Sequence, residues 1–194
     1  MWPSGLRRSL AKGVKFNRFR GFESHRLLQL DNDMNYFIDT EFLELPEGPQ
    51  LLSVGFVSQD GREYYAQNTE LDLNLANEWV KKNVFPHLTV RDWKTKKTIA
   101  HELMEFCNTG ERSNEFWAFF GTYDWYLITQ LFGGFMNMPR HWPQYYMELM
   151  QLGKLTGITL DDWPLQVSKS HMALDDAKWN LDVYNFITSR INRR

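Results

Sequence analysis

The amino-acid sequence predicts one α/β domain, a mixed β-sheet flanked by helices, and three observations support this prediction. The chain has 194 residues, of which 43% are hydrophobic, enough to bury a single core without disulfides or a structural metal. Three β-rich segments lie close together early in the pattern, and helical segments alternate with one further apolar strand after them. Such an arrangement is typical of a sheet whose faces are covered by helices.

Three strands are predicted between residues 35 and 67. Residues 35–42 (NYFIDTEF), 51–58 (LLSVGFVS) and 62–67 (REYYAQ) are rich in aromatic and β-branched residues, which favour strands. The dipeptide Asp60-Gly61 lies between the second and third segments and is the strongest short signal for a hairpin. We therefore expect the three strands to be antiparallel neighbours.

Two helices and a buried strand are predicted next. Residues 71–85 place Leu71, Leu75, Trp79 and then Val80 at helical spacing before Pro86 ends the pattern. A second amphipathic helix is expected over residues 95–108. The segment NEFWAFF that follows is a near-continuous apolar run of the kind found in buried strands.

The last third of the chain predicts two further helices. Residues 123–132 fit a helix that ends at Gly133-Gly134, and residues 145–157 fit a strand or a helix equally well. The final helix is expected over residues 171–191, with an apolar stripe made of Leu174, Ala177, Leu181 and Tyr184.

The first 33 residues differ from the rest of the chain in charge and pattern. They carry seven lysines and arginines against three acids, a net charge of +4, whereas the other 161 residues carry 15 basic against 21 acidic residues, a net of −6. A transit peptide, a nucleic-acid-binding arm, and translated or tag-like upstream sequence all fit this segment. We favour the third, and we expect a disordered leader over 1–33, a natural start at Met34 and a single domain over 34–194.

The cysteine count and the hydropathy bound the compartment. Cys107 is the single cysteine, so a disulfide within the chain is impossible and the reducing cytoplasm is the simplest setting. No apolar run approaches the ~20 residues that a membrane-spanning helix needs. We therefore expect a cytoplasmic protein without a membrane partner.

Carboxylates interrupt segments that otherwise predict burial. Asp39 and Glu41 lie two residues apart on the first strand, so both side chains point to one face. Asp124 begins a helix directly after a buried strand, and Asp175 and Asp176 lie in the first turns of the last helix. If these acids converge, they repel one another unless hard cations hold them together, and Mg²⁺ or Mn²⁺ suits oxygen ligands.

Three motifs resemble, in family order, those of the DEDDh 3′-to-5′ exonucleases, a branch of the ribonuclease H-like superfamily. FIDTE places the family's Asp-x-Glu on Asp39 and Glu41, GTYDW places its second acid on Asp124, and HMALDDA places its third motif on His171 and Asp176. The small size and the strings DTEF and HMALDDAKWN are most similar to the adenosine-specific exoribonuclease subfamily known from mycobacteria and phages.

The resemblance implies a ribonuclease H-like fold and phosphodiester hydrolysis with two divalent cations, Mg²⁺ or Mn²⁺. Asp39 would bridge the cations, and Glu41, Asp124 and Asp176 would complete their ligands. His171, a residue type that titrates near neutral pH, would be the general base. Nucleoside 5′-monophosphates would leave one at a time from the 3′ end.

The resemblance also suggests how substrate is held. Thr40 and Phe42, beside the first motif, would contact the terminal sugar and base, and Trp125 is a candidate to stack on a base of single-stranded nucleic acid. RNA is the favoured substrate, and a homodimer is expected by analogy with relatives.

Three other functions stay open on the sequence alone. A DNA exonuclease of repair or recombination would use the same carboxylates, because only a contact to the 2′-hydroxyl separates the two sugars. An inactive nucleic-acid-binding module on the same fold is disfavoured because all five catalytic positions of the family's motifs are present. A structural domain with coincidental acids would require those acids to lie far apart.

Overall fold

A computed structural model describes residues 34–108, 110, 113–168 and 170–191. By its internal contacts the chain divides into Met1–Asp31 and Asn32–Arg194, and the description below concerns the second unit. The predicted leader over residues 1–33 lies outside the described residues.

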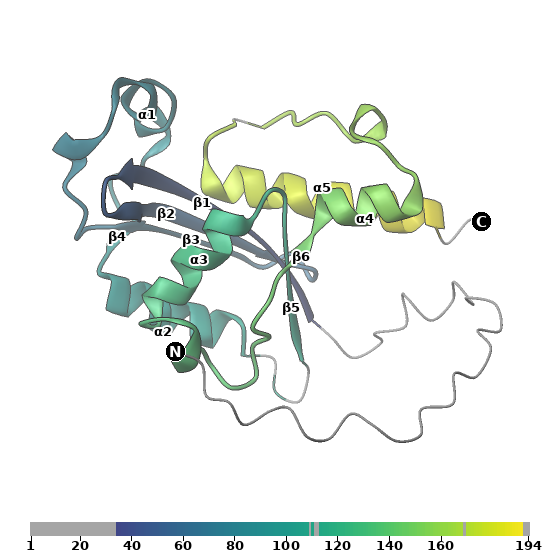
Figure 1. The fold of residues 1–194 in the computed structure, drawn as a ribbon, viewed down its shortest axis with the longest axis horizontal. Coiled ribbons are helices and arrows are strands. Elements are labelled where there is room, and N and C mark those ends of the chain that lie inside the picture. Colours follow the sequence, from purple (N-terminus) through teal and green to yellow (C-terminus); the bar gives the residue numbers. More distant parts are fainter. Residues whose placement is uncertain (1–33, 109, 111–112, 169, 192–194) are drawn as a thin grey trace, which may run out of the picture. The chain divides into compact units, whose positions relative to one another are not determined.

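In the described part of the chain, six strands form one sheet in the order β4-β3-β2-β1-β5-β6 (Figure 1). β1 (Met34–Leu45), β2 (Gly48–Ser58) and β3 (Glu63–Asn68) are antiparallel neighbours, which confirms the three predicted strands. The predicted hairpin joins β2 to β3, and Gly61 adopts a φ of +87° there, a conformation that glycine reaches without steric cost. The early sequence therefore forms half of the sheet by local pairing.

The other half of the sheet is parallel. β5 (Asn114–Ala118), predicted from its apolar run, pairs with β1 from Met34↔Asn114 to Phe37↔Trp117. Beyond Phe37 the edge of β1 is no longer paired with β5. That uncovered edge provides the position where the acidic residues gather.

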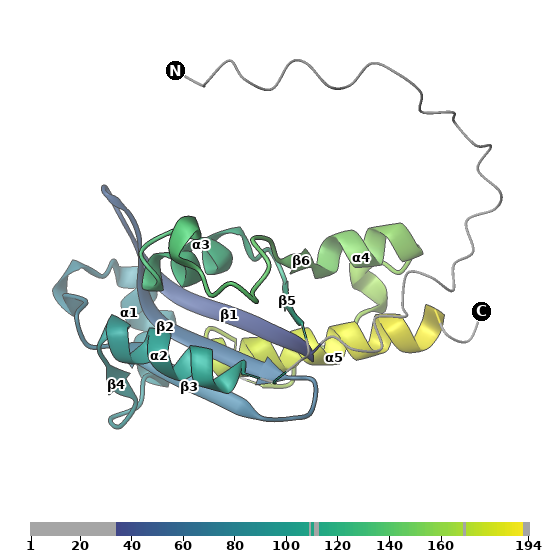
Figure 2. The same cartoon turned by 90° about the horizontal axis from the view of Figure 1, so that it is seen from below.

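Helices cover both faces of the sheet (Figure 1). α2 (Lys96–Phe106) and α3 (Thr122–Leu131) pack on one face, and α4 (Leu149–Thr156) and α5 (Ala173–Ile191) pack on the other. Figure 2 shows α2 lying over β3. The predicted α/β mixed sheet flanked by helices is confirmed.

The alternation of side chains on β1 builds both cores. Tyr36 and Ile38 belong to the cluster beneath α2 and α3, whereas Phe37 belongs to the cluster beneath α4 and α5. All three are fully buried. Because successive side chains on a strand point to opposite faces, β1 contributes to the hydrophobic clusters on both faces of the sheet. Packing on either side therefore fixes the position of the polar residues of β1.

The helix predicted over residues 71–85 is wrong in extent. The chain forms a short 3₁₀ turn, η2 (Leu73–Leu75), then α1 (Glu78–Asn83), then a second turn, η3 (Phe85–His87). Asn77 ends the continuity, because its side chain accepts a hydrogen bond from the backbone N–H of Val80 and begins a new helix there. Trp79 and Leu75 are left 54% and 55% exposed, whereas Val80 is buried, so only part of the predicted apolar stripe packs against the sheet.

The ambiguous segment 145–157 contains both structures. Met147–Glu148 forms the two-residue strand β6, and α4 begins directly after it. A similar two-residue strand, β4 (Trp93–Lys94), pairs with β3 at the opposite edge. Neither short strand has a sequence signal, since two residues show no periodicity and each is defined only by its neighbour in the sheet.

The last helix is present, and its buried face overlaps the predicted stripe without coinciding with it. Of the predicted residues, Ala177 is buried, and Leu174, Leu181 and Tyr184 are half-buried and pack against the same cluster. The fully buried face is made of Ala173, Ala177, Asn180, Val183 and Ile187. Because Asn180 is polar, the pattern of hydrophobic residues in the sequence does not mark it as part of the buried face.

Among the described residues, no helix has the length and hydrophobicity that crossing a membrane requires.

Candidate active site

Two of the predicted acids lie side by side on β1. Asp39 and Glu41 share one face of the strand, and a register shift between Glu41 and Phe42 interrupts the pairing with β2 immediately after them. Irregularities of this kind re-aim side chains next to functional sites. On β2 the residue opposite Asp39 is Gly55, so nothing larger than hydrogen stands beside the carboxylate on the neighbouring strand.

Gly55 lets the start of α5 reach the sheet. A Cβ atom built on Gly55 would lie 2.3 Å from the backbone oxygen of Ala173, the first residue of α5. Further along the same helix, the side-chain amide of Asn180 donates a hydrogen bond of 2.9 Å to the backbone oxygen of Ile38. Both contacts fix the first turns of α5 against the part of the sheet that carries Asp39.

This docking brings a third acid to the first two. One carboxylate oxygen from each of Asp39, Glu41 and Asp176 lies within 4.8 Å of the other two. Asp175, the adjacent acid, is not in this group, as expected from the turn of about 100° between neighbouring residues of a helix. The oxygens thus converge from two segments that are far apart in the chain.

A substitution at Gly55 tests this arrangement. Replacing Gly55 by Ala is expected to push the start of α5 away from β2, because backbone at 2.3 Å cannot coexist with a methyl group. Stability should fall by about 1–3 kcal/mol, as in other overpacked cores, and divalent-cation affinity should fall about tenfold or more. Thermal unfolding and calorimetric Mn²⁺ titration measure both. Unchanged Mn²⁺ affinity would show that this close packing does not position Asp176.

Asp124 is held against the uncovered edge of β1. Its Oδ1 accepts hydrogen bonds from the backbone N–H of Thr40 at 2.7 Å and from the Thr40 hydroxyl at 2.6 Å. A buried strand N–H without a partner would be costly, and Asp124, at the first turn of α3, satisfies the one that β5 leaves unpaired. Asp124 is 7% exposed, so its orientation is set by β1 rather than by solvent.

The electrostatics of the cluster favour a cation. Burial, followed by the charges of Asp124, Asp176 and Glu41, raises the pKa of Asp39 well above its usual value. Burial and the neighbouring charges raise the pKa of Glu41 to about 8, and burial raises the pKa of Asp124 to about 6 against the opposing Thr40 hydrogen bonds. The pKa of Asp176 is also raised, chiefly by burial. Burial is the largest cause of each shift, and for Asp39 and Glu41 the neighbouring carboxylates add to it.

The donor set fits a hard divalent cation. Within the described ranges, no lysine or arginine forms an ion pair with any of these four acids. Clustered carboxylate oxygens without a basic partner are the ligands that Mg²⁺ and Mn²⁺ prefer. The acidic cluster is therefore compatible with metal binding.

His171 lies just before α5 with an unusual backbone. Its φ is +66°, and its backbone N–H donates a 2.9 Å hydrogen bond to Oδ2 of Asp176. The side-chain amide of Gln166 donates to Oδ1 of the same carboxylate. Both oxygens of Asp176 are thus oriented by the segment that carries His171, and the structure brings all five predicted catalytic residues to one region.

The predicted substrate residues are placed differently from one another. The Thr40 side chain is buried and bound to Asp124, and Phe42 is half-buried with its ring edge-on to Tyr123 at 5.1 Å. Trp125 is 4% exposed and packs in the core beneath α3, which argues against stacking on a base.

Three neighbours of the site were missed in the sequence. Tyr123 is 47% exposed beside Phe42, Trp79 contacts the ring of His171, and Gln166 binds Asp176. Tyr123 could have been found from its position directly before Asp124. The other two come from segments without any motif.

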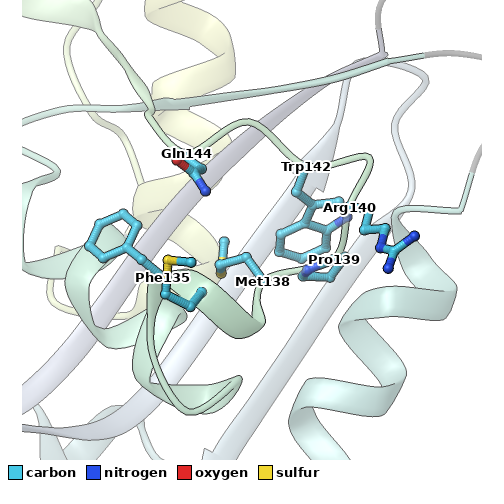
Figure 3. Close-up of a pocket in the computed structure, with 7 residues that line it drawn as sticks. Phe135, Met138, Pro139, Arg140, Trp142 and Gln144 are labelled. Atoms are coloured by element: carbon cyan, nitrogen blue, oxygen red, sulfur yellow. The ribbon is translucent and has the colours of Figure 1, made fainter. Parts of the chain in front are cut away.

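A separate hollow of about 500 Å³ lies between η4 (Phe135–Asn137) and the loop that follows it (Figure 3). None of the five predicted catalytic residues lines it. Its lining side chains, which Figure 3 draws, are Phe135, Met136, Met138, Pro139, Arg140, Trp142 and Gln144. The carboxylates therefore do not lie in this hollow.

Solved structures share the fold. A product-bound exonuclease I matches with a TM-score of 0.56 and 10% identity, over 84% of this chain and 45% of that one. The Mg²⁺- and Mn²⁺-bound form of Pop2p from S. pombe matches with a TM-score of 0.51 and 12% identity, over 80% and 83% of the two chains. At these identities the likeness concerns the fold, and it confirms the predicted ribonuclease H-like architecture.

Sequence comparison reaches further than the fold. The 3′-5′ exoribonuclease Rv2179c of Mycobacterium tuberculosis strain H37Rv is 38% identical over 160 residues, which cover 80% of this chain and 94% of the relative. A relative from strain CDC 1551, also named a 3′-5′ exoribonuclease, matches to the same extent. A family model described as the 3′-5′ exoribonuclease Rv2179c-like domain matches residues 34–188. The chain belongs to the family of Rv2179c-like 3′-5′ exoribonuclease domains.

Proposed function

We propose that residues 34–194 form a single exonuclease domain that hydrolyses the 3′ ends of single-stranded RNA to nucleoside 5′-monophosphates with two divalent cations. Membership of the exoribonuclease family supports the reaction class. The observation that carries the proposal is the convergence of carboxylate oxygens from Asp39, Glu41 and Asp176 within 4.8 Å. Coincidental surface acids would not be expected to converge in this way from two segments that lie far apart in the chain.

Asp39, Glu41, Asp124 and Asp176 would hold the cations, either Mg²⁺ or Mn²⁺. When bound, two such ions neutralise the charge that develops on the attacking and leaving oxygens of a phosphodiester. Hydrogen bonds orient two of the four acids before any cation arrives, since Thr40 orients Asp124 and Gln166 and His171 orient Asp176. Such outer hydrogen bonds commonly tune metal affinity by about 10- to 100-fold.

His171 would act as the general base. Its position beside Asp176 suits a group that accepts the proton of the water attacking the terminal phosphodiester, and the leaving oxygen becomes the new 3′-hydroxyl of the shortened strand. General bases of this kind contribute about 10²- to 10⁴-fold to the rate.

The aromatic pair Phe42 and Tyr123 would contact the terminal nucleotide. Both side chains lie beside site residues, and Tyr123 retains 47% of its surface in solvent. Aromatic rings stack on bases of single strands with about 1–3 kcal/mol each. The hydroxyl and the backbone N–H of Thr40 both bind Asp124, so the proposed Thr40 contact to substrate would come from its carbonyl oxygen.

A gel assay tests the proposed function. Labelled RNA and DNA homopolymers are incubated with the protein and Mg²⁺ or Mn²⁺, and the products are resolved beside nucleoside 5′-monophosphate standards. We expect stepwise shortening of 5′-labelled RNA, slower attack on DNA, and no reaction with chelator. Endonucleolytic fragments, or equal rates on DNA, would contradict the assignment to RNA 3′ ends.

The cytoplasmic location and the homodimer stay predictions. Sedimentation equilibrium measures whether the protein is a homodimer.

A further inference from the structure

The backbone of His171 is held in a conformation that needs support. Among the described residues, Phe120 and His171 are the two non-glycine residues with positive φ, at +53° and +66°. Such backbone states cost on the order of 1–3 kcal/mol and persist only when their surroundings impose them. For His171, the hydrogen bond from its N–H to Asp176 accounts for the backbone but leaves the direction of the imidazole undetermined.

The contact that limits the imidazole is with Trp79. The two ring centroids lie 4.8 Å apart with an interplanar angle of 78°, an edge-to-face geometry that is worth about 0.5–1.5 kcal/mol beyond area burial. In the described part of the chain, the imidazole nitrogens of His171 form no hydrogen bond, so this ring contact is what restricts its rotation.

Trp79 is itself rigidly mounted. Its helix, α1, begins at the Asn77 cap and is rooted by Val80, which is 5% exposed and packs with Leu43 and Leu52 of the sheet. The side-chain amide of Asn83 donates a 2.8 Å hydrogen bond to the backbone oxygen of Trp79. A short helix without these anchors would be marginal, so the packing fixes where the indole reaches.

Trp79 does not contribute to a hydrophobic core, so core packing does not explain why a tryptophan stands at this position. The side chain is 54% exposed and belongs to none of the three hydrophobic clusters of the described residues. A large apolar side chain that is left in solvent on a well-anchored helix, and that contacts a functional residue from a distant segment, points to a role at the site.

We propose that Trp79 is a positioning residue that holds the imidazole of His171 in the orientation required for proton abstraction. This inference rests on the proposed role of His171 as the general base. Trp79 touches the base rather than the reacting atoms, so its effect on the reaction passes through His171 alone. Because a small misplacement of a catalytic group can cost about 10²-fold, loss of the indole should be felt in turnover.

A double-mutant cycle tests the proposal, with kcat and KM measured on labelled RNA. Trp79→Ala should lower kcat by about 10- to 100-fold and leave KM within about twofold, and Trp79→Phe, which restores an aromatic edge contact, should recover most of the loss. In a His171→Ala background, Trp79→Ala should have no further effect. Losses that multiply, or a raised KM with unchanged kcat, would overturn the proposal.

A second measurement does not depend on activity. In metal-free protein, the imidazole proton resonances of His171, identified by their disappearance in His171→Ala, should shift in Trp79→Ala because the indole ring current is removed. An unchanged resonance would overturn the contact. Leu75→Ala is the matched control, since Leu75 is 55% exposed in the same region but has no ring; it should leave kcat and the resonance unchanged.

The failure of this proposal is distinguishable from that of the proposed function. If His171→Ala retains wild-type turnover, the general-base assignment fails. If His171→Ala is impaired and Trp79→Ala acts independently of it, only the positioning role of Trp79 fails.

Discussion

Replacing Asp39 by Asn is expected to abolish RNA hydrolysis, lowering kcat by about a thousandfold or more, while the metal-free protein becomes more stable. Asp39 lies among three acids whose charges disfavour its ionisation, so the neutral amide removes repulsion in the absence of metal. The same change removes an oxygen ligand, and a thousandfold loss corresponds to ~4 kcal/mol of transition-state stabilisation. Hydrolysis rates and melting temperatures with and without Mn²⁺ measure the two effects.

The adjacent acids of α5 provide a matched control. Asp176→Asn should behave like Asp39→Asn, whereas Asp175→Asn should keep wild-type turnover. The reason is that Asp176, and not Asp175, belongs to the cluster of carboxylates with Asp39 and Glu41. Both substitutions remove one charge at the same end of the same helix. Loss of turnover in Asp175→Asn with retention in Asp176→Asn would reverse the assignment.

The metal-free protein is expected to lose stability as the pH rises from about 5 to about 8. Burial raises the folded-state pKa of Glu41 to about 8 and raises that of Asp39, whereas unfolded carboxyl groups titrate near ~4. Between these values the folded state binds more protons than the unfolded state, so the free energy of unfolding falls with increasing pH. A loss of about 2 kcal/mol would lower the melting temperature by roughly 4–8 °C.

Divalent cations should reverse this trend. Mn²⁺ binds the ionised carboxylates and releases their protons, so the stabilisation at a fixed Mn²⁺ concentration should grow with pH. Melting temperatures across the same pH range, with chelator or with Mn²⁺, measure it. Glu41→Gln separates this effect from other titrating groups: its pH dependence should be shallower than that of the wild type. Equal slopes in the two proteins would show that Glu41 does not carry the effect.

Much of the architecture was predictable because it is encoded locally. The strands from 35 to 67 follow from residue type and from Asp60-Gly61, whose glycine reaches the required φ. The helices at 95–108 and 123–132 follow from periodicity and are confirmed as α2 and α3. The prediction of one helix over residues 71–85 failed because the Asn77 side chain caps a new helix inside that range.

The buried face of α5 was only partly predictable, for a related reason. Asn180 lies at its centre, and a polar residue lowers the apparent hydrophobicity of that face. Only the folded chain supplies the Ile38 carbonyl oxygen that satisfies its amide. The strands β4 and β6 are likewise products of pairing with a neighbour rather than of their own two residues.

The sequence by itself predicted the antiparallel pairing of its early strands and identified the acids that interrupt buried segments, and the resemblance of its motifs to a known family implied the reaction class. The tertiary structure decided how those acids meet. Gly55 admits α5 to the sheet, Thr40 anchors Asp124 at an unpaired strand edge, and Trp79 reaches His171 from another segment. These contacts join residues far apart in the chain, and no local pattern encodes a contact that depends on where two distant segments are packed.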